Sequence, residues 1–398
     1  MSEGQFRKSL TYASGYAILT MVYSHIGTFR THLSAPNDRL MCLSIVRSVI
    51  GVFILVTSVV MSSASHADDV WQSFETRTQA SLRGLAAVNK DVAWACGSKG
   101  TIVQTIDGGT NWLQHTIPNL HDVEIRSLHA WDRDNAIVAT AGQPALILKT
   151  TDRGVTWKTT YEHKSPQAFF DALKFRNERS GLAFSDPVDG SLLLVKTDDG
   201  GDSWKRIESE AIPMMDKGEA GFAASNSSLH MFGDDFAWIG LGGGSEGPSR
   251  IFRSQDGGIR WTSYPVPPIA RGLSSGVFSI AFESEFNGVA VGGDYNKTTV
   301  DNQNIAITRD TGKSWRAPRG NRPRGFRSSV IAVEKTWLTC GPSGCDWSLD
   351  GEDWFAMSDI GFHVITVAAD GSIWAAGSEG RIARMTNEAR RLNLPNAR

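Results

Sequence analysis

The sequence predicts an all-β protein, a seven-bladed β-propeller in which the N-terminal strand of the mature chain completes the last blade. Three observations support this fold. One turn motif occurs six times, short apolar or alternating runs separate its copies, and the 398 residues include 40 glycines and 13 tryptophans. The tryptophans that close successive copies lie 39 to 57 residues apart. Because periods of roughly 40–50 residues are typical of propeller blades, the repeat predicts this fold.

The turn motif has the pattern Ser/Thr-x-Asp-x-Gly-x-Ser/Thr-Trp, and its first copy is TIDGGTNW at residues 105–112. Further copies occupy 150–157, 197–204, 254–261, 308–315 and, in a shortened form, 348–354. In a hairpin turn the carboxylate and hydroxyl can accept backbone N–H bonds, glycine supplies a positive φ, and tryptophan begins the next strand. A catalytic centre would occur once, so we interpret the motif aspartates as structural: Asp107, Asp152, Asp199, Asp256, Asp310 and Asp350.

The segments between the turns have the character of strands. The first unit contains RGLAAV, DVAWACG and GTIVQT, and the second contains IRSLHAW, NAIVATAG and ALILKT. Each unit therefore predicts three strands, the turn and a fourth strand, which is a four-stranded blade. Six turns give six blades, and residues 363–386 add three strands without a closing motif. Residues 69–77 then supply the missing outer strand of a seventh blade, which leaves no open sheet edge.

The predicted domains are a leader at 1–67, the propeller at 68–390 and a C-terminal tail at 391–398. Residues 48–60, SVIGVFILVTSVV, follow Arg47 and precede a small-residue stretch that is typical of a signal-peptide cleavage site. This run is shorter than the roughly 20 residues of a membrane span, so no stable span is expected. Met41 is a candidate true start. We expect a secreted or periplasmic protein, and the alternative is a bipartite signal that directs the chain to the thylakoid lumen.

Charge and cysteine content narrow the function classes. Five of the 40 basic and two of the 42 acidic residues lie in the leader, so the remaining chain has a net charge of −5, which argues against nucleic-acid binding. No His/Cys cluster has metal-ligand spacing, and no metal or cofactor is expected. Cys340 and Cys345 in CGPSGC can form a disulfide in an oxidising compartment or remain free buried thiols. We expect a monomer.

The turn motif is the Asp-box, or BNR repeat. On its six copies and the blade pattern VAWACGSKGTIVQTIDGG, residues 69–386 resemble the photosystem II stability/assembly factor family and its bacterial relatives. FSDPVDG (184–190), GEAGFAAS (218–225), FSIAF (278–282) and VAVGGDY (289–295) resemble a bacterial branch of it. The resemblance implies a secreted seven-bladed propeller with an arginine-rich patch that contacts a partner protein. Asp-boxes also occur in sialidases, xyloglucanases and sorting receptors, and a fold alone does not determine function.

Candidate binding residues are expected on the face opposite the Asp-boxes, where the second-to-third-strand and blade-to-blade connections lie. The irregular insertions there are 184–192, 207–228, 242–250, 292–304 and 316–328. A glycosidase would need paired carboxylates. The weak catalytic candidates are Asp186, Glu219, Asp294 and Tyr295, with Asp189 and Asp301 as further acids; each can equally cap a turn or face solvent. The candidate partner-binding residues are Arg316, Arg319, Arg322, Arg324 and Arg327.

Two hypotheses follow. The first is a non-enzymatic, exported propeller that binds a protein or peptide on the loop-rich face, through the arginine segment 316–327. The second is a carbohydrate-active propeller, a glycoside hydrolase or a lectin, that uses Asp186, Glu219 and Asp294 on the same face.

Overall fold

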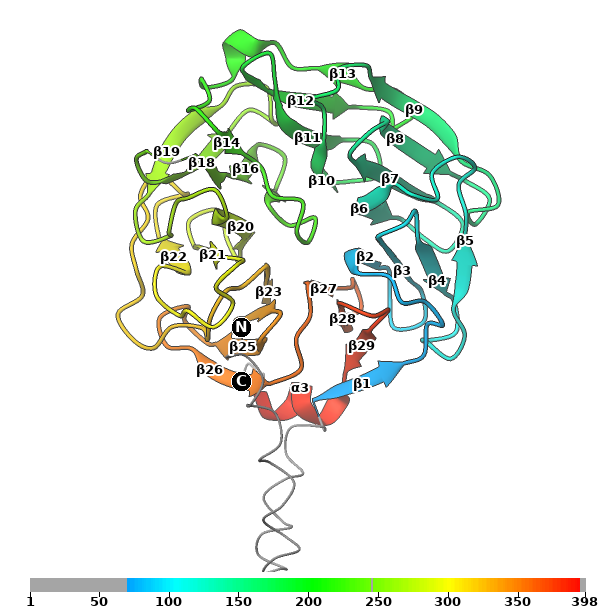
Figure 1. Ribbon diagram of the computed structural model, residues 1–398. Coiled ribbons are helices and arrows are strands. Elements are labelled where there is room, and N and C mark those ends of the chain that lie inside the picture. Colours follow the sequence, from blue (N-terminus) through cyan, green and yellow to red (C-terminus); the bar gives the residue numbers. More distant parts are fainter. Residues whose placement is uncertain (1–69, 245, 394–398) are drawn as a thin grey trace, which may run out of the picture. The chain divides into compact units, whose positions relative to one another are not determined.

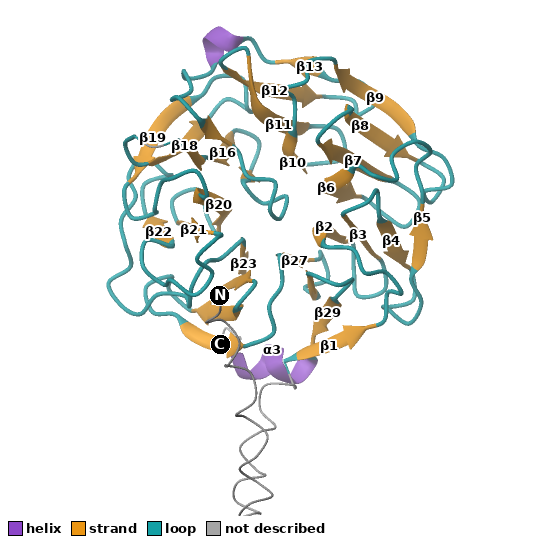
Figure 2. Cartoon of the chain, in the orientation of Figure 1, coloured by secondary structure: helices purple, strands orange, loops and turns teal. Residues whose placement is uncertain are grey.

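The computed structural model describes residues 70–244 and 246–393, and it consists of seven β-sheets arranged as blades around a centre (Figure 1). The predicted leader, residues 1–67, lies outside the described residues. Strands and the loops that connect them make up almost all of the described chain, as the colouring in Figure 2 shows. The predicted seven-bladed β-propeller is confirmed.

Each blade places its first strand at the centre and its last strand outside (Figure 1). The strands of blades one to three are β2 (Leu82–Ala87), β3 (Ala93–Gly97), β4 (Ile102–Thr105), β5 (Leu113–His115), β6 (Glu124–Ala130), β7 (Ala136–Ala141), β8 (Ala145–Thr150), β9 (Lys158–His163), β10 (Phe170–Phe175), β11 (Gly181–Val188), β12 (Ser191–Thr197) and β13 (Lys205–Arg206). Those of blades four and six are β15 (Leu229–Phe232), β16 (Phe236–Gly240), β18 (Ser249–Ser254), β19 (Thr262–Val266), β23 (Ser329–Val333), β24 (Thr336–Gly341), β25 (Gly344–Ser348) and β26 (Phe355–Ser358).

The two ends of the propeller share the seventh blade. Its sheet has the order β1-β29-β28-β27, with β1 (Trp71–Phe74), β27 (Val364–Val367), β28 (Ile373–Ala376) and β29 (Ile382–Met385). Strand β1 runs antiparallel to β29, with Trp71 opposite Met385 and Phe74 opposite Ile382. Helix α3 (Asn387–Asn393) follows β29, and its residue Ala389 is buried in the same hydrophobic cluster as Trp71 and Met385.

The Asp-boxes form turns between the third and fourth strands. In the box at 197–204, the Thr197 hydroxyl donates to the Asp199 carboxylate at 2.7 Å and accepts from Gly201 N–H at 2.9 Å. The other Asp199 contacts are the backbone N–H of Ser203 at 3.0 Å and its hydroxyl at 2.6 Å. Gly201 has a φ of 85°, and its hypothetical Cβ would lie 2.6 Å from Ile137 of the preceding blade. The turn therefore requires glycine for both conformation and space.

The closing tryptophans join neighbouring blades. Trp112 of blade one lies edge-on to Trp374 of blade seven at 6.2 Å, and Trp157 of blade two lies edge-on to Trp94 of blade one at 6.5 Å. Four tryptophans in second strands are almost completely buried: Trp94, Trp238, Trp337 and Trp374. The ring therefore closes through aromatic contacts that bury large areas between consecutive sheets.

An Asp-box variant tests the structural interpretation of the motif. Replacing Asp199 by alanine removes the acceptor of three turn hydrogen bonds. We expect the free energy of unfolding to fall by about 1 kcal/mol, the low end for bonds to a charge because the turn is exposed. Hydrogen bonds from Ser203 lower the pKa of Asp199, so this stabilisation is present above about pH 4 and is lost as the pH falls through the folded pKa. Urea unfolding at pH 7 and pH 3 measures both effects, and an equal loss at the two pH values would contradict this account; Asp199→Asn, which keeps one acceptor, is the control.

Blade five departs from the predicted pattern of four strands. Its sheet contains β20 (Ser275–Phe282), β21 (Gly288–Asp294) and β22 (Ile305–Thr308), and two short strands, β14 (Glu219–Ala220) and β17 (Gly242–Gly243), continue the strand order on the other side of β20. The expected outer strand is reduced to a bridge between Ile307 and Arg316. Pro318 follows two residues later and has no N–H to donate, so pairing stops there.

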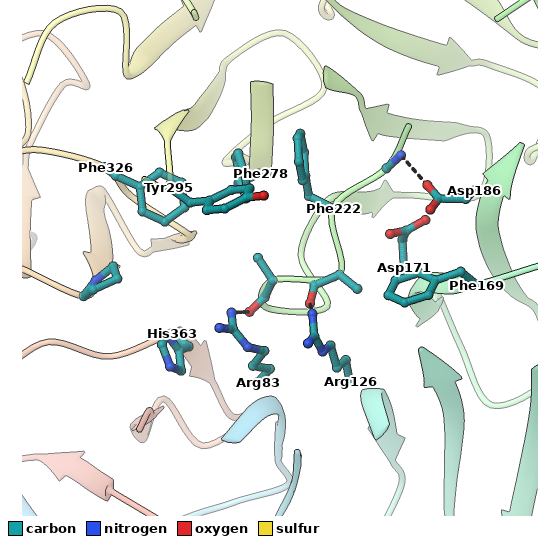
Figure 3. A pocket seen from close by; sticks show the side chains of 14 residues that line it. Arg83, Arg126, Phe169, Asp171, Asp186, Phe222, Phe278, Tyr295, Phe326 and His363 are labelled. Atoms are coloured by element: carbon teal, nitrogen blue, oxygen red, sulfur yellow. Dashed lines mark hydrogen bonds between the residues drawn. The ribbon is translucent and has the colours of Figure 1, made fainter. Parts of the chain in front are cut away.

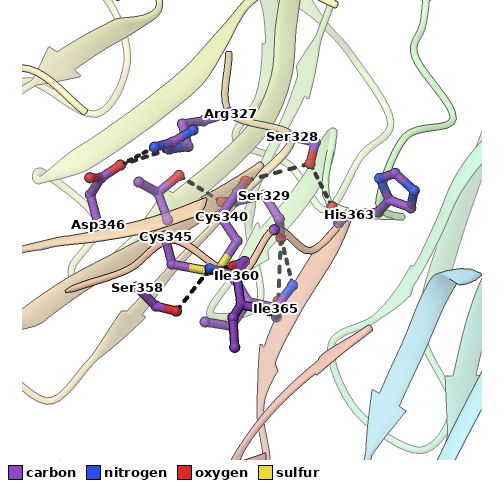
Figure 4. The surroundings of a disulfide bond; sticks show 12 residues. Arg327, Ser328, Ser329, Cys340, Cys345, Asp346, Ser358, Ile360, His363 and Ile365 are labelled. Carbon is purple, nitrogen blue, oxygen red and sulfur yellow. Dashed lines mark hydrogen bonds and ion pairs between the residues drawn. A yellow bond between two sulfur atoms is a disulfide. The ribbon is translucent and has the colours of Figure 1, made fainter. Parts of the chain in front are cut away.

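Of the two alternatives for Cys340 and Cys345, the structure has the disulfide. The two cysteines face each other across strands β24 and β25, with their Cα atoms 4.1 Å apart (Figure 4). Cys96 is free and buried.

Within the described residues, no helix has the length and apolar character that a membrane crossing requires.

Candidate functional site: a pocket at the centre of the propeller

A segment of the connection between blades three and four lies across the centre of the ring. We call residues 221–228 the strap; in Figure 1 it belongs to the green loop that reaches inward between β10 and β20. Asn226 at its middle accepts from the backbone N–H of Leu173 on β10 and donates to the backbone carbonyl of Leu128 on β6, both at 2.8 Å. A single buried amide therefore links the inner strands of blades two and three.

The strap also contacts the other side of the ring. The Ser225 hydroxyl donates to the Ser328 carbonyl at 2.6 Å, and the Ser227 hydroxyl lies 2.7 Å from the hydroxyl of Ser279. The Ile280 N–H donates to the Ser227 carbonyl at 2.9 Å. The strap thus makes hydrogen bonds with inner-strand residues of blades five and six as well as two and three.

The pocket lies beside the strap, at the ends of the inner strands that face away from the Asp-boxes (Figure 3). Its volume is about 430 Å³, which suits a small molecule or a few residues of a peptide. The residues that line it come from six blades and the strap: Arg83, Arg126, Phe169, Asp171, Asp186, Gly221, Phe222, Ala223, Ala224, Phe278, Tyr295, Phe326, Pro342 and His363.

β-Bulges direct the main polar and aromatic side chains into this pocket. The strand register shifts between Leu82 and Gly84, between Ile125 and Ser127, between Phe170 and Ala172, and between Val277 and Ser279. The residue left out of the ladder is in each case a pocket residue: Arg83, Arg126, Asp171 and Phe278. A fifth shift, between Ser185 and Pro187, leaves out Asp186. A bulge turns one side chain away from the regular in-and-out alternation of a strand. The five bulges therefore place these five side chains in the pocket.

The arginine side of the pocket is positively charged and has few partners. The Nη1 atom of Arg83 lies 3.5 Å from the Ala224 carbonyl and that of Arg126 lies 3.4 Å from the Ala223 carbonyl. Arg126 also pairs with Glu124 at 3.0 Å. Burial, and then repulsion from Arg126, lowers the pKa of Arg83 to about 10, so it remains charged at neutral pH. Burial and these arginines lower the pKa of His363 to about 3, so this imidazole is neutral.

A pair of carboxyl groups occupies another side of the pocket. Asp186 accepts the backbone N–H of Gly221 at 3.0 Å, and Asp171 lies next to it (Figure 3). Burial raises the pKa of Asp186 to about 6, and burial together with the Asp186 charge raises the pKa of Asp171 well above its ordinary value. Two neighbouring carboxyl groups in such a site tend to share a proton.

Aromatic rings form the third side. Phe222 of the strap stacks on Phe278 with centroids 3.9 Å apart, and Tyr295 lies edge-on to both rings. Phe326 lies edge-on to Phe278 at 4.7 Å. Tyr295 is 46% exposed, so this wall continues to the surface. The pocket therefore combines positive, negative and apolar surfaces.

Only part of the predicted carboxylate set converges. Asp186 and Tyr295 line the pocket, whereas Glu219 and Asp294 do not. Glu219 is buried and accepts a hydrogen bond from Arg250 Nε at 2.8 Å. Its carboxylate therefore belongs to an internal ion pair with Arg250. Asp294 accepts from the Ser274 hydroxyl at 2.7 Å and caps the turn that follows β21. Asp186 therefore lines the cavity without Glu219 and Asp294, which local partners hold, and this arrangement gives no support to the three acids as one catalytic set.

The remaining acids lie in exposed loops. Asp189 is in the tight turn between β11 and β12, with a φ of 54°, and Asp301 is exposed in the loop before β22. The predicted insertion 184–192 is an extended hairpin of these two strands and not an irregular loop.

Most of the arginine segment is occupied by internal ion pairs. Arg327 is completely buried and donates from Nε to Asp346 at 2.7 Å, so its assignment as a surface partner-binding residue is wrong. Arg324 pairs with Asp346 at 2.8 Å and Asp359 at 2.6 Å, and Arg316 pairs with Glu352. Arg319 and Arg322 are exposed, and no carboxylate of the described chain lies within 4 Å of their guanidinium groups. Only these two could present free charge to a partner.

Sequence reasoning missed Arg83, Arg126, Asp171 and His363, although a signal existed. The inner strands read LRGL at 82–85, IRSL at 125–128 and FDAL at 170–173, with the pocket residue at the second position each time. A charged residue at the same place in several buried strands is unusual, and aligning the repeats would have shown it.

Part of the sequence is similar to known proteins. The sequence model of the photosynthesis system II assembly factor YCF48 matches residues 63–170. The photosystem II assembly lipoprotein Ycf48 of Synechococcus sp. (strain CC9902) is 27% identical over 142 residues, which cover 35% of this chain. The match spans 41% of the length of that relative. Over these residues the propeller is similar in sequence to photosystem II assembly factors of the Ycf48 type.

Solved structures share the propeller fold over about four fifths of this chain. A structure described as YCF48 bound to D1 peptide has a TM-score of 0.55 at 17% identity, over 80% of this chain and 95% of that one. YCF48 from Cyanidioschyzon merolae has a TM-score of 0.55 at 15% identity, over 80% and 99%. The GH74 xyloglucanase of Xanthomonas campestris has a TM-score of 0.51 at 14% identity, over 79% and 53%. At these identities the likeness concerns the fold.

Proposed function

We propose that this chain is a non-enzymatic propeller that binds a peptide segment of a partner protein in the central pocket. The observation that carries the proposal is a pocket of about 430 Å³ in which two arginines and an aromatic wall face the same space. Arginine forks bind carboxylates with two parallel hydrogen bonds, and the aromatic rings add apolar contact. The similar fold described as YCF48 bound to D1 peptide supports a peptide ligand.

In this proposal Arg83 and Arg126 receive a carboxylate of the peptide, from its C-terminus or from an acidic side chain. Their contacts with the strap carbonyls are long, at 3.5 and 3.4 Å, so most of their donors are available. Arg319 and Arg322 supply additional positive charge on the exposed segment 316–327 and would guide an acidic partner toward the protein.

The test uses fluorescein-labelled hexapeptides with free C-terminal carboxylates, screened as a positional library by fluorescence polarisation. We expect Arg83→Gln together with Arg126→Gln to weaken the best peptide at least tenfold, because each charge-assisted bond contributes about 1.5–3 kcal/mol. Arg206→Gln, which removes an exposed arginine on outer strand β13, is the matched control and should bind as wild type.

Two results would overturn the proposal: no library peptide binds, or the double variant binds as tightly as the control. A third variant, Arg319→Gln with Arg322→Gln, measures the contribution of the arginine segment. We expect it to slow association and to reduce the salt dependence without removing binding. The non-enzymatic part is tested by incubating the wild type with a glycan panel, where hydrolysis that Asp186→Asn removes would favour the glycosidase alternative.

The proposal includes export of the protein. The apolar stretch 48–60 with its small-residue boundary is typical of a signal peptide, and the Cys340–Cys345 disulfide suits an oxidising compartment. N-terminal sequencing of the protein from the periplasm of an expressing bacterium should find a start near residue 68. Retention of the full leader in the cytosol would contradict export.

A further inference from the structure

Asp171 has hydrogen-bond acceptors that no described protein group except the neighbouring Asp186 uses. The residue is 1% exposed, and apart from a proton shared with Asp186 its carboxyl oxygens have no hydrogen-bond partner within the described chain. Asp186 beside it accepts one bond, from the Gly221 N–H. A buried carboxylate is costly unless a cation or several donors compensate it. Burial and the Asp186 charge raise the pKa of Asp171, so the pair keeps a shared proton, and a cationic donor could take the place of that proton.

The charged groups that face the pair do not provide that compensation. Arg126 is the nearest cation, and its charge lowers the pKa of Asp171, yet no ion pair between them within 4 Å occurs among the described residues. Its guanidinium contacts Glu124 and the Ala223 carbonyl instead. Arg83 contacts the Ala224 carbonyl. The room between the carboxyl pair and the arginines is part of the open pocket.

The surroundings of the pair are shaped for close approach. A Cβ at Gly221 would lie 2.5 Å from an Asp171 oxygen, so only glycine lets the strap backbone reach the carboxyl groups. Phe169 lies beside Asp171, and Phe222 borders the pocket from the strap (Figure 3). Aromatic faces attract cations, and they also pack against alkyl stems.

We propose that Asp171 and Asp186 form a subsite for a cationic group, the ammonium or guanidinium of a lysine or arginine side chain in the bound peptide. The inference rests on the proposed function only in that a peptide enters this pocket. The ammonium donates to the free oxygens of Asp171 and to Asp186, and the alkyl stem lies along the phenylalanine rings. Arg83 and Arg126 then hold a carboxylate of the same peptide, so the pocket selects ligands that carry both charges.

Binding at this subsite is coupled to proton release. The pair attracts a cation once Asp186 is ionised, and burial raises the pKa of Asp186 to about 6; the charge of Asp186 in turn raises the pKa of Asp171, which loses its proton to make room for the cation. Affinity should therefore rise with pH and fall about tenfold per pH unit below pH 6. Folding shows the opposite dependence: the raised pKa values stabilise the folded state below about pH 4, and this stabilisation is lost as the pH rises through about 6. A bound cation offsets that loss.

The experiment uses butylammonium chloride as the probe and sodium butyrate, which has the same chain length and the opposite charge, as its control. We expect butylammonium to raise the melting temperature at pH 7.5 with a dissociation constant in the millimolar range, as suits about five heavy atoms. The apparent affinity should be about tenfold weaker at pH 5, and the shift should disappear in the Asp171→Asn, Asp186→Asn double variant. Asp189→Asn, which changes an exposed carboxylate in the turn of the same hairpin, should respond as wild type.

Equal shifts in the double variant and the wild type, or no shift in the wild type, would overturn the subsite. If the double variant does not fold, Asp186→Asn alone and calorimetry in two buffers of different ionisation enthalpy replace it, and binding without proton release at pH 6 would overturn the proposal. The result is separable from the proposed function. Peptides that need Arg83 and Arg126 but gain nothing from a lysine over norleucine would reject the cation subsite and retain peptide binding.

Discussion

Replacement of Asp346 by alanine is expected to lower the free energy of unfolding by about 3–5 kcal/mol, the range for one partner lost from a buried ion pair. Asp346 is 1% exposed and contacts two arginines of the 316–327 segment. Arg327, whose ion pair with Asp346 is drawn in Figure 4, has no exposed surface. Without Asp346 it would keep only the Ser343 hydroxyl at 2.9 Å and its neighbouring carbonyl at 3.0 Å. Its charge would then be buried without a counterion. Equilibrium urea unfolding of the purified protein measures the loss.

Two further variants make this result specific. Asp359→Ala removes the exposed partner of Arg324, and because surface ion pairs contribute about 0–1 kcal/mol, stability should change little. Arg327→Met combined with Asp346→Leu replaces the buried pair by apolar side chains and should recover much of the stability. A loss below 1 kcal/mol in Asp346→Ala would contradict the structural role of Arg327 and return it to the candidates for partner contact.

Replacement of Asn226 by alanine is the second large expected effect, a loss of about 3–5 kcal/mol. The backbone N–H of Leu173 and the carbonyl of Leu128 would both lose their partners in a buried region, at about 1–3 kcal/mol each. The φ of Asn226 is 57°, and alanine in this conformation adds roughly 1 kcal/mol. Thermal and urea unfolding give the loss.

Asn226→Gly separates the two contributions, because glycine accepts the positive φ but makes neither hydrogen bond. It should recover about 1 kcal/mol relative to alanine and remain well below wild type. If the glycine variant were as stable as the wild type, the side-chain bonds between blades two and three would have no measurable role.

The sequence predicts the fold because the Asp-box is local. All bonds of one box join residues within a few positions, as between Thr197, Asp199 and Ser203, so one copy can be read from eight consecutive letters. Counting the copies then determines the number of blades. Even the departure in blade five has a local cause in Pro318, which ends the outer strand.

The pocket is harder to predict because it depends on register and on distant segments. Arg83 and Asp171 enter the centre through bulges, and a bulge changes which side of a strand a residue faces without a distinct sequence signal. The arginine segment shows the same difficulty for charge. It contains no acid, so its sequence predicts a free positive patch, but Asp346, Glu352 and Asp359 reach it from later in the chain.

The strap changes how a local structural disturbance can pass between the blades of the propeller. In a ring whose sheets contact only their neighbours, a disturbance in one blade is passed on stepwise. Here the strap makes direct hydrogen bonds to residues in or next to the inner strands of blades two, three, five and six. The same loop contributes Gly221 to Ala224 to the wall of the pocket and Ser225 and Ser227 to a separate cavity of about 140 Å³. The strap therefore borders both cavities, and a ligand that displaces it would disturb hydrogen bonds to blades on opposite sides of the ring at the same time.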